Sequence, residues 1–195
     1  KVSEFAKDNN ISGLEFMSCI PGSIGGGIRM NSGCFKKEFK DFLISIQVVD
    51  FKGLVRSIPA NKIRFNYRSI ELPKDLIFLS ATFKGKQKNS EEINNYMTEL
   101  NTIKNMAQPT KIKTSGSTFK NPISQTDKKV WELIKSSVSH EISYGDAVIS
   151  KKHANFFVNK KNAKAADMKS LINFVKKKVK DQTGIKLELE IVVVE

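Results

Sequence analysis

The feature that most constrains the fold of this chain is at Gln108-Pro109, where the residue pattern changes from that of a helix to that of a loop. Before this point, residues 91–105 carry apolar side chains at helical spacing, namely Ile93, Tyr96, Met97, Leu100 and Ile103. This spacing predicts a long amphipathic helix, with Ser90 as its N-cap. After this point a loop rich in serine, glycine and threonine begins. A long helix that stops at such a loop predicts a boundary between two domains.

The rest of the chain mixes strands and helices without a repeating strand–helix–strand order, so we predict an α+β fold. We expect residues 1–18 to form a short helix and a turn. Strands are predicted over residues 42–50, 54–58, 76–83 and 187–194, and a turn at 51–53 joins the first two as a hairpin. Two more helices are predicted over residues 127–137 and 167–179, and Gly184 ends the second.

Composition narrows the class of protein. Hydrophobic residues make up 39% of the chain and charged residues 27%, which is typical of a globular protein. No apolar stretch approaches the ~20 residues that cross a bilayer. Two cysteines and two histidines predict neither a disulfide framework nor a metal site. The small number of cysteines also predicts a reducing compartment. Because the chain starts at Lys1 without a methionine or a signal peptide, we expect it to be an interior part of a longer protein.

The charge of the chain indicates anionic partners. The 33 basic residues outnumber the 20 acidic ones and give a net charge of +13. Most of the basic residues are scattered lysines, and the arginines are only Arg29, Arg56, Arg64 and Arg68. Nucleic acid is therefore not the partner we expect, and small anions such as nucleotides fit better.

A glycine-rich segment spans Pro21, Gly22 and Ser23 and continues through Gly25, Gly26 and Gly27. Glycines let the main chain pack directly against a neighbour, and successive main-chain amides can cradle a pyrophosphate. The spacing matches neither the dinucleotide fingerprint nor the Walker loop. From the glycines alone, a ligand cradle and a tight turn between packed elements are both open interpretations.

Two further segments carry side chains suited to chemistry. Arg68 follows Tyr67 and is able to clamp a carboxylate or a phosphate, or to pair on the surface with Glu71. Ser117 lies in a loop of hydroxyl residues just before a predicted helix. Its hydroxyl suits an anion site or a proton donor, and an ordinary turn is the alternative.

A lone histidine and a glutamate complete the candidates. His153 precedes an apolar strand, where a hydrogen-bonded structural role is more common than catalysis. Glu190 alternates with β-branched residues in the predicted last strand. A carboxylate is costly to bury there unless it is paired, so Glu190 either faces a site or lies at a solvent-exposed edge.

Taken in order, these segments resemble the UDP-N-acetylenolpyruvoylglucosamine reductase family, the flavoenzymes that make UDP-N-acetylmuramate for bacterial peptidoglycan, in its shorter form. The resemblance covers essentially the whole chain. It rests on a colinear series of motifs: Gly13-Leu14-Glu15-Phe16, Ile20-Pro21-Gly22-Ser23-Ile24-Gly25-Gly26, Asn31-Ser32-Gly33, Phe65-Asn66-Tyr67-Arg68-Ser69, Gln108-Pro109, Ser115-Gly116-Ser117-Thr118-Phe119-Lys120-Asn121-Pro122, Lys152-His153-Ala154-Asn155-Phe156 and Leu187-Glu188-Leu189-Glu190-Ile191.

The resemblance implies a particular domain organisation. Residues 1–106 would be the second lobe of a two-lobe FAD-binding domain, and residues 107–183 an α/β substrate-binding domain. Residues 184–195 would return as a strand that packs on the flavin part. The family's N-terminal FAD lobe would precede Lys1, so we expect this chain to be an incomplete fragment.

The resemblance also implies a cytoplasmic bacterial enzyme in which NADPH reduces FAD and the flavin reduces the enolpyruvyl group of a UDP-sugar. Three residues take the catalytic positions: Ser117 as proton donor, with Arg68 and Glu190 at the substrate carboxylate. The cofactor-binding positions are those of the glycine-rich segment, namely Pro21, Gly22, Ser23, Gly25, Gly26 and Gly27. The substrate-binding positions are Tyr67, Lys104 and Asn121.

Four places depart from the family pattern. Residues 31–36 replace a motif that usually ends in Ala-Tyr-Gly, and Val148 stands where a glutamine is common. Leu189 stands where a proline usually precedes the last glutamate, and Lys104 stands where an arginine is common. A second interpretation, from the residues alone, is a non-catalytic basic module that binds nucleotide-sugars or nucleic acid.

Overall fold

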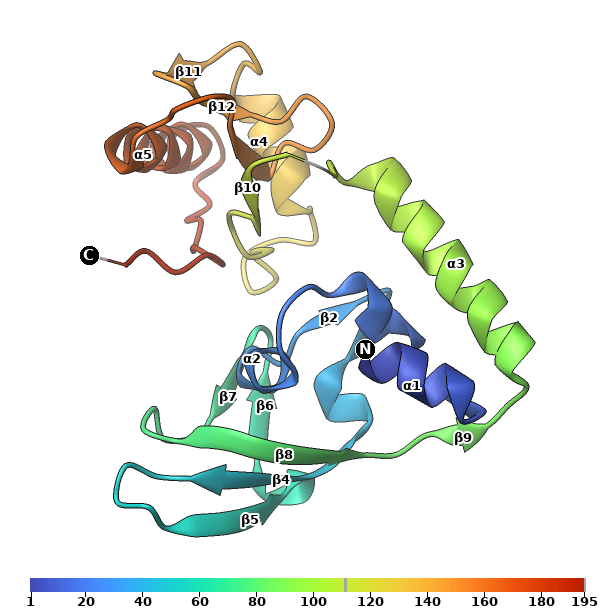
Figure 1. The fold of residues 1–195 in the computed structure, drawn as a ribbon. Coiled ribbons are helices and arrows are strands. Elements are labelled where there is room, and N and C mark those ends of the chain that lie inside the picture. The colour runs from blue at the N-terminus through green and yellow to red at the C-terminus, as the bar shows by residue number, and fades with distance from the viewer. Residues whose placement is uncertain (111, 195) are drawn as a thin grey trace. The chain divides into compact units, whose positions relative to one another are not determined.

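The computed structural model describes residues 1–110 and 112–194. The chain divides into two compact units, Lys1–Lys104 and Asn105–Glu195, and each is described by itself (Figure 1). Helices and strands are mixed in both units, so the predicted α+β class is confirmed. Within the described residues, no helix combines the length and apolar character needed to cross a membrane.

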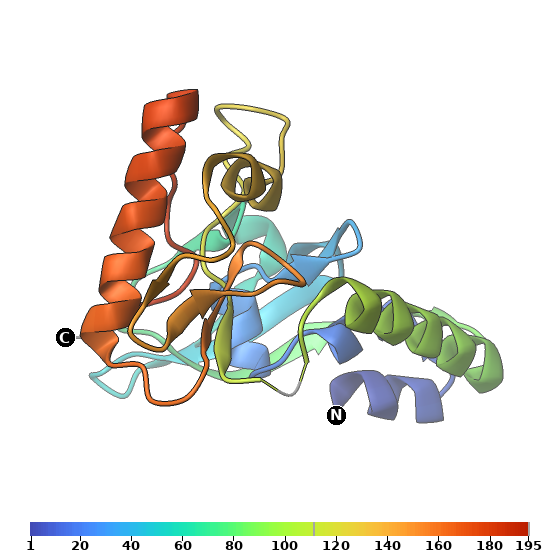
Figure 2. The same ribbon diagram turned by 90° about the horizontal axis from the view of Figure 1, so that it is seen from above.

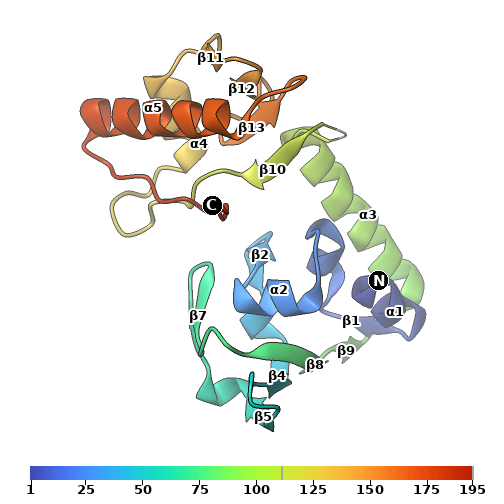
Figure 3. The same cartoon turned by 60° about the vertical axis from the view of Figure 1, so that its left-hand side comes forward.

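The first unit is built on a three-stranded antiparallel sheet in the order β5–β4–β8. These strands are β4 (Leu43–Val49), β5 (Val55–Pro59) and β8 (Ile77–Phe83), so the predicted hairpin and the third strand are confirmed. Helix α2 (Ile24–Arg29) lies over the sheet (Figure 3). The core between them contains the buried Ile28, Ile46 and Val48.

Short elements surround this sheet. Three two-stranded pairs are formed by β1 with β9, β2 with β3, and β6 with β7. Their bounds are Ile11–Ser12 for β1, Gly33–Cys34 for β2, Lys37–Glu38 for β3, Arg64–Asn66 for β6, Ser69–Glu71 for β7 and Lys86–Gln87 for β9. Helix α1 (Val2–Asp8) begins the chain, as predicted. The 3-10 helices are η1 (Glu15–Cys19), η2 (Phe39–Asp41) and η3 (Ala60–Lys62).

The predicted long helix is α3 (Ser90–Ala107), and its buried face carries Ile93, Met97 and Leu100. The predicted cap is wrong by one residue. Ser90 is already helical, and the Oδ1 atom of Asn89 accepts a hydrogen bond from the main-chain N–H of Glu91 at 2.8 Å. The asparagine before the serine therefore satisfies one of the open amides of the first turn.

The second unit has a four-stranded antiparallel sheet in the order β10–β13–β12–β11. The strands are β10 (Thr114–Ser117), β11 (Ser143–Tyr144), β12 (Ala147–Ile149) and β13 (Phe156–Asn159). Helix α5 (Ala165–Thr183) runs beside this sheet (Figure 2), and α4 (Val130–Ser137) packs against α5. Gly184 ends α5 with a left-handed φ of 74°, as predicted.

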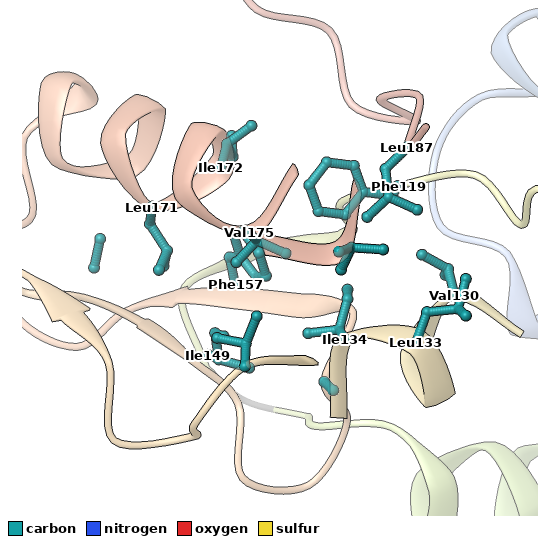
Figure 4. Packing of buried hydrophobic residues seen from close by; sticks show 14 residues of the cluster. Phe119, Val130, Leu133, Ile134, Ile149, Phe157, Leu171, Ile172, Val175 and Leu187 are labelled. Atoms are coloured by element: carbon teal, nitrogen blue, oxygen red, sulfur yellow. The ribbon is translucent and has the colours of Figure 1, made fainter. Parts of the chain in front are cut away.

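The core of the second unit joins the helices to the sheet. Figure 4 shows Leu171 and Val175 of α5 directed toward Phe157 of β13, with Ile134 of α4 close by. Each of these side chains is at most 1% exposed. Phe119, from the chain just after β10, fills the centre and meets Phe157 edge-on. This packing places the segment that contains Ser117 directly on the core.

Two boundaries in the second unit differ from the predictions. Helix α4 begins at Val130 instead of Asp127, because Lys129 has an extended backbone, with ψ 147°, and is the N-cap of the helix. The predicted strand over 187–194 is wrong, since only an isolated antiparallel bridge forms between Phe119 and Leu189. Leu187 is buried in the core, but the chain beyond Ile191 has no partner strand among the described residues. Its packing on the flavin part stays a prediction.

Candidate functional site

Ser117 lies at the end of β10, where the strand departs from regular pairing. The register with β13 shifts between Thr114 and Ser117, which is a β-bulge. Gly116 sits inside the bulge with φ 86°, a conformation that favours glycine. The Thr114 hydroxyl donates to the carbonyl of Phe157 at 2.7 Å and accepts from the N–H of Gly116 at 3.3 Å. The bulge is therefore built into the fold, and it re-aims the half-buried Ser117.

The main chain after Ser117 is held from both sides. On one side, the N–H of Thr118 donates to the carbonyl of Asn155 at 2.8 Å. On the other side, the N–H of Glu190 donates to the carbonyl of Thr118 at 2.9 Å, and the N–H of Lys120 to that of Glu188 at the same distance. The structure therefore brings Ser117 and the half-buried Glu190 into one part of the second unit.

Asn155 is a residue that the sequence analysis did not single out. It is 3% exposed, and its side-chain amide makes hydrogen bonds to both main-chain groups of Phe119. Its Oδ1 accepts from the N–H of Phe119 at 3.0 Å, and its Nδ2 donates to the carbonyl of Phe119 at 2.8 Å. An asparagine at the start of an apolar strand is the one sequence signal that could have pointed to it.

Asn121 precedes α4 in the chain, and its side chain contacts the first residue of that helix. Its Oδ1 accepts from the main-chain N–H of Val130 at 3.0 Å. The structure therefore places Asn121 a few residues beyond Ser117, on the same segment and beside the first turn of a helix.

A basic pocket of about 330 Å³ lies on the second unit. It gathers both histidines of the chain with three lysines and an indole: Lys135, Lys151, Lys152, His140, His153 and Trp131. The described residues that line this pocket include no carboxylate. Such a lining favours anions.

The two imidazoles of the basic pocket differ in their surroundings. Burial holds the pKa of His153 below its ordinary value, and its Nδ1 accepts from the N–H of Asn155 at 3.2 Å. The Nδ1 atom of His140 is buried and has no hydrogen-bond partner among the described residues. An anion that entered the pocket would favour the charged form of the His153 ring.

Arg68 is in the first unit, in the turn between β6 and β7. Its φ is 56°, a left-handed conformation that is uncommon for a residue with a side chain. Its Nη2 donates to the carbonyl of Gly33 at 2.9 Å, and its Nη1 lies 3.9 Å from the Glu38 carboxylate. The guanidinium is also 4.9 Å from the centre of the Tyr67 ring. These contacts fix the direction of the guanidinium, on a side chain that is 18% exposed.

A buried asparagine supports this arrangement. Asn31 is fully buried, and its Nδ2 donates to the Glu38 carboxylate at 3.0 Å and to the carbonyl of Asn66 at 3.1 Å. Its Oδ1 accepts from the main-chain N–H of Lys40 at 3.2 Å. Asn31 thereby ties the partner of Arg68 to the strand that precedes Arg68. The sequence analysis quoted Asn31 only as part of a motif.

The glycine-rich segment opens α2. The Ser23 hydroxyl caps this helix by accepting from the N–H of Gly26 at 3.1 Å. Gly22 has φ 116°, and apart from its two chain neighbours none of the described residues has an atom within 4 Å of the place that a Cβ would take. A Cβ on Gly27, in contrast, would lie 2.4 Å from the Phe39 ring. Gly27 therefore serves packing, whereas the turn from Pro21 to Ser23 is exposed to solvent.

Lys104 has a partner at the start of the same segment. Its Nζ donates to the carbonyl of Cys19, two residues before Pro21. The first unit therefore contains Arg68, Tyr67, Lys104 and the glycine-rich segment, and the second unit contains Ser117, Asn121 and Glu190. That these two groups form one site stays a prediction. Among the described residues, no three His, Cys, Asp or Glu side chains gather as metal ligands.

Comparison with known proteins shows which class of protein the second unit belongs to. Residues 108–194 match the model of the C-terminal domain of UDP-N-acetylenolpyruvoylglucosamine reductase. The crystal structure of such a reductase from Thermus caldophilus matches with a TM-score of 0.83 and 32% identity, over 97% of this chain and 66% of that one. The second unit therefore belongs to the class of C-terminal domains found in these reductases.

Curated relatives extend the match to both units. The UDP-N-acetylenolpyruvoylglucosamine reductase of Pelagibacter ubique is 64% identical over 98% of this chain and 63% of its own length. That of Rickettsia bellii is 45% identical over 97% of this chain and 62% of its own length. The chain belongs to the UDP-N-acetylenolpyruvoylglucosamine reductase family, as its sequence motifs predicted. It spans 62–63% of the length of these two relatives.

Proposed function

We propose that this chain acts in the reduction of the enolpyruvyl group of UDP-N-acetylglucosamine enolpyruvate to UDP-N-acetylmuramate, in the bacterial cytoplasm, with NADPH as hydride donor and FAD as its carrier. The observation that carries the proposal is the main-chain hydrogen bond from Glu190 to Thr118, which brings Glu190 next to the residue that follows Ser117 at the end of β10. The names of the relatives supply the substrate.

Ser117 is the proton donor in this proposal. When hydride adds to the vinyl carbon of the substrate, negative charge builds on the carbon next to the carboxylate, and that carbon must gain a proton. Ser117 is partly exposed, and the bulge changes the direction of its side chain, which suits proton transfer to a bound substrate. Glu190, on the neighbouring segment, would face the same carboxylate end of the substrate.

Arg68 offsets the charge that builds on the substrate carboxylate in this proposal. A guanidinium presents a planar fork of donors that matches a carboxylate, and Gly33 and Glu38 already fix its direction. A group that is held before the reaction stabilises developing charge without further reorganisation. Tyr67 would support Arg68 through the face of its ring.

The anionic part of the substrate suits the second unit. The basic pocket favours a diphosphate. The side chain of Asn121 contacts the first residue of α4, the helix that contributes Trp131 and Lys135 to the pocket. Both lie on the unit that contains Ser117, so a substrate held there by its diphosphate would keep its sugar within the same unit.

The first unit has residues that fit FAD. The turn from Pro21 to Ser23 is exposed, and Gly22 leaves its main chain open to a neighbouring group. Pro21, Gly22, Ser23, Gly25 and Gly26 would contact FAD, while Gly27 lets α2 lie against Phe39. When bound, FAD supplies the hydride that the substrate accepts. Lys104 would hold the turn in place through Cys19.

The test uses the full-length protein that carries this chain. FAD binding is measured by flavin fluorescence, the flavin is reduced with NADPH, and enolpyruvyl UDP-N-acetylglucosamine is then added. We expect rapid reoxidation of the flavin by this substrate. Absence of FAD binding, or binding of RNA with a steep salt dependence and no reoxidation, would contradict the proposal and favour a basic binding module.

A further inference from the structure

We propose that Asn155 is a positioning residue for the proton-transfer step, because it fixes the peptide that aims Ser117 and aligns it with Glu190. The inference rests on the proposed function of Ser117. Asn155 touches neither substrate nor cofactor in this scheme and acts through the main chain.

The need for such a residue comes from the bulge. The ladder between β10 and β13 ends at the pair of Ser117 with Phe156, so the chain beyond Ser117 leaves regular pairing. Thr118 still donates to the main-chain carbonyl of Asn155 at 2.8 Å. The next residue, Phe119, is bonded on this side by the amide side chain of Asn155 instead of by a strand. Asn155 therefore continues the ladder past the bulge.

The chemistry of the clamp is specific to asparagine. Its amide offers an acceptor and a donor at the distance that the two groups of one residue require, here 3.0 Å to the N–H and 2.8 Å to the carbonyl of Phe119. Aspartate would place a second acceptor against that carbonyl. Alanine would leave both main-chain groups of a residue that is 1% exposed without these partners.

The two hydrogen bonds between Asn155 and Phe119 are linked through the main chain to both candidate catalytic residues. Ser117 is two residues before the clamped Phe119, and the intervening Thr118 accepts from the N–H of Glu190 on its other side. A shift of the Phe119 peptide therefore moves the Ser117 hydroxyl and the Glu190 main chain relative to one another. Small misplacements of reacting groups have large effects on rate.

The experiment compares two variants of the full-length protein, Asn155→Ala and Asn155→Asp, with a matched control, Asn159→Ala. Asn159 lies at the other end of β13, and its Oδ1 accepts from the N–H of Ala163 at 2.9 Å, so the control also loses a side-chain hydrogen bond in this unit. Stopped-flow absorbance measures flavin reduction by NADPH and reoxidation by the enolpyruvyl substrate separately. Thermal melting reports the stability of each variant.

We expect both Asn155 variants to reduce the flavin at the wild-type rate and to be reoxidised about tenfold or more slowly, with substrate affinity nearly unchanged. The control keeps both rates, although it melts earlier. Reoxidation at the wild-type rate in a folded Asn155 variant would overturn the proposal. A loss of both half-reactions in proportion to the fall in melting temperature would also overturn it, since that outcome would indicate a merely structural role.

A second measurement covers variants that do not fold. Amide hydrogen exchange of the wild-type protein reports whether the N–H of Phe119 is protected as strongly as the strand amides of β13, which the clamp requires. Exchange at the rate of an exposed loop would overturn the proposal. If the wild-type flavin is not reoxidised by the substrate at all, the proposed function fails instead, and the exchange result still decides whether Asn155 holds this peptide.

Discussion

The main-chain N–H of Glu190 donates to the main-chain carbonyl of Thr118 at 2.9 Å. This bond joins the C-terminal segment to the chain that follows β10, far away in the sequence. It makes the spacing of Ser117 and Glu190 a property of the main chain, which side-chain substitutions at either position leave in place. Variants at these positions can therefore be interpreted chemically.

Ser117→Ala is expected to separate the two half-reactions. Flavin reduction by NADPH keeps its rate, while reoxidation by the substrate slows about 100-fold or more, because the variant lacks the proposed proton donor. Rapid kinetics with the full-length protein measure both. The control is Ser115→Ala, at an exposed position of the same strand. Equal loss of both half-reactions in Ser117→Ala would contradict the assignment.

Arg68→Lys keeps the charge but loses the planar fork. We expect reoxidation by the substrate to fall about 100-fold, with flavin reduction unchanged, because a lysine cannot hold the substrate carboxylate through two parallel bonds. Arg64→Lys is the matched control, since Arg64 is 77% exposed and pairs only with Glu71 among the described residues. If both lysine variants behave alike, Arg68 has no special role.

Thr118→Val is expected to stabilise the protein. Thr118 is 1% exposed, and its hydroxyl has no hydrogen-bond partner among the described residues. Replacing that hydroxyl by a methyl group removes the cost of burying it, so the free energy of unfolding should rise by about 1 kcal/mol. Thr114→Val is the counterpart, because the Thr114 hydroxyl donates to Phe157 and its loss should cost about 1 kcal/mol. Chemical denaturation measures both, and destabilisation by Thr118→Val would refute the first.

His153 predicts a pH dependence of stability. Its pKa is lowered by burial, so the unfolded chain binds a proton more readily than the folded protein. Stability should therefore fall as the pH drops below the ordinary histidine value of about 6.5, and level off below the pKa of the folded state. The His153→Gln variant should lose less stability between pH 7.5 and 5.5 than the wild type. Melting curves at the two pH values check this, and an equal loss in both proteins would contradict it.

Much of the fold could be predicted because its signals are local. The hairpin of β4 and β5 follows from two apolar runs around a turn, and Gly184 ends α5 because it adopts a left-handed conformation. The last segment could not be predicted in the same way. Alternation in residues 187–194 looks like a strand, but a strand needs a continuous partner strand, and the described residues form only the isolated bridge between Phe119 and Leu189.

The residues of the candidate site also fall into those that could be predicted from the sequence and those that could not. Ser117, Arg68 and Glu190 were predicted from the family resemblance, and their roles stay predictions. Asn155 and Asn31 were missed as site residues because a buried amide acquires its role from main-chain groups that only the folded chain brings to it. Gly27 was expected to contact a cofactor. The structure shows a second reason for glycine here, because a Cβ at this position would clash with the Phe39 ring.

The left-handed backbone of Arg68 has a consequence for variation at this position. At φ 56°, glycine or asparagine would suit the main chain better, and an arginine stores conformational energy of roughly 1 kcal/mol there. In a variant library screened for thermal stability alone, glycine should be enriched at this turn and arginine depleted. In the same library screened for growth that depends on the enzyme, arginine should return. Selection for stability and selection for activity would then favour different residues at this one position.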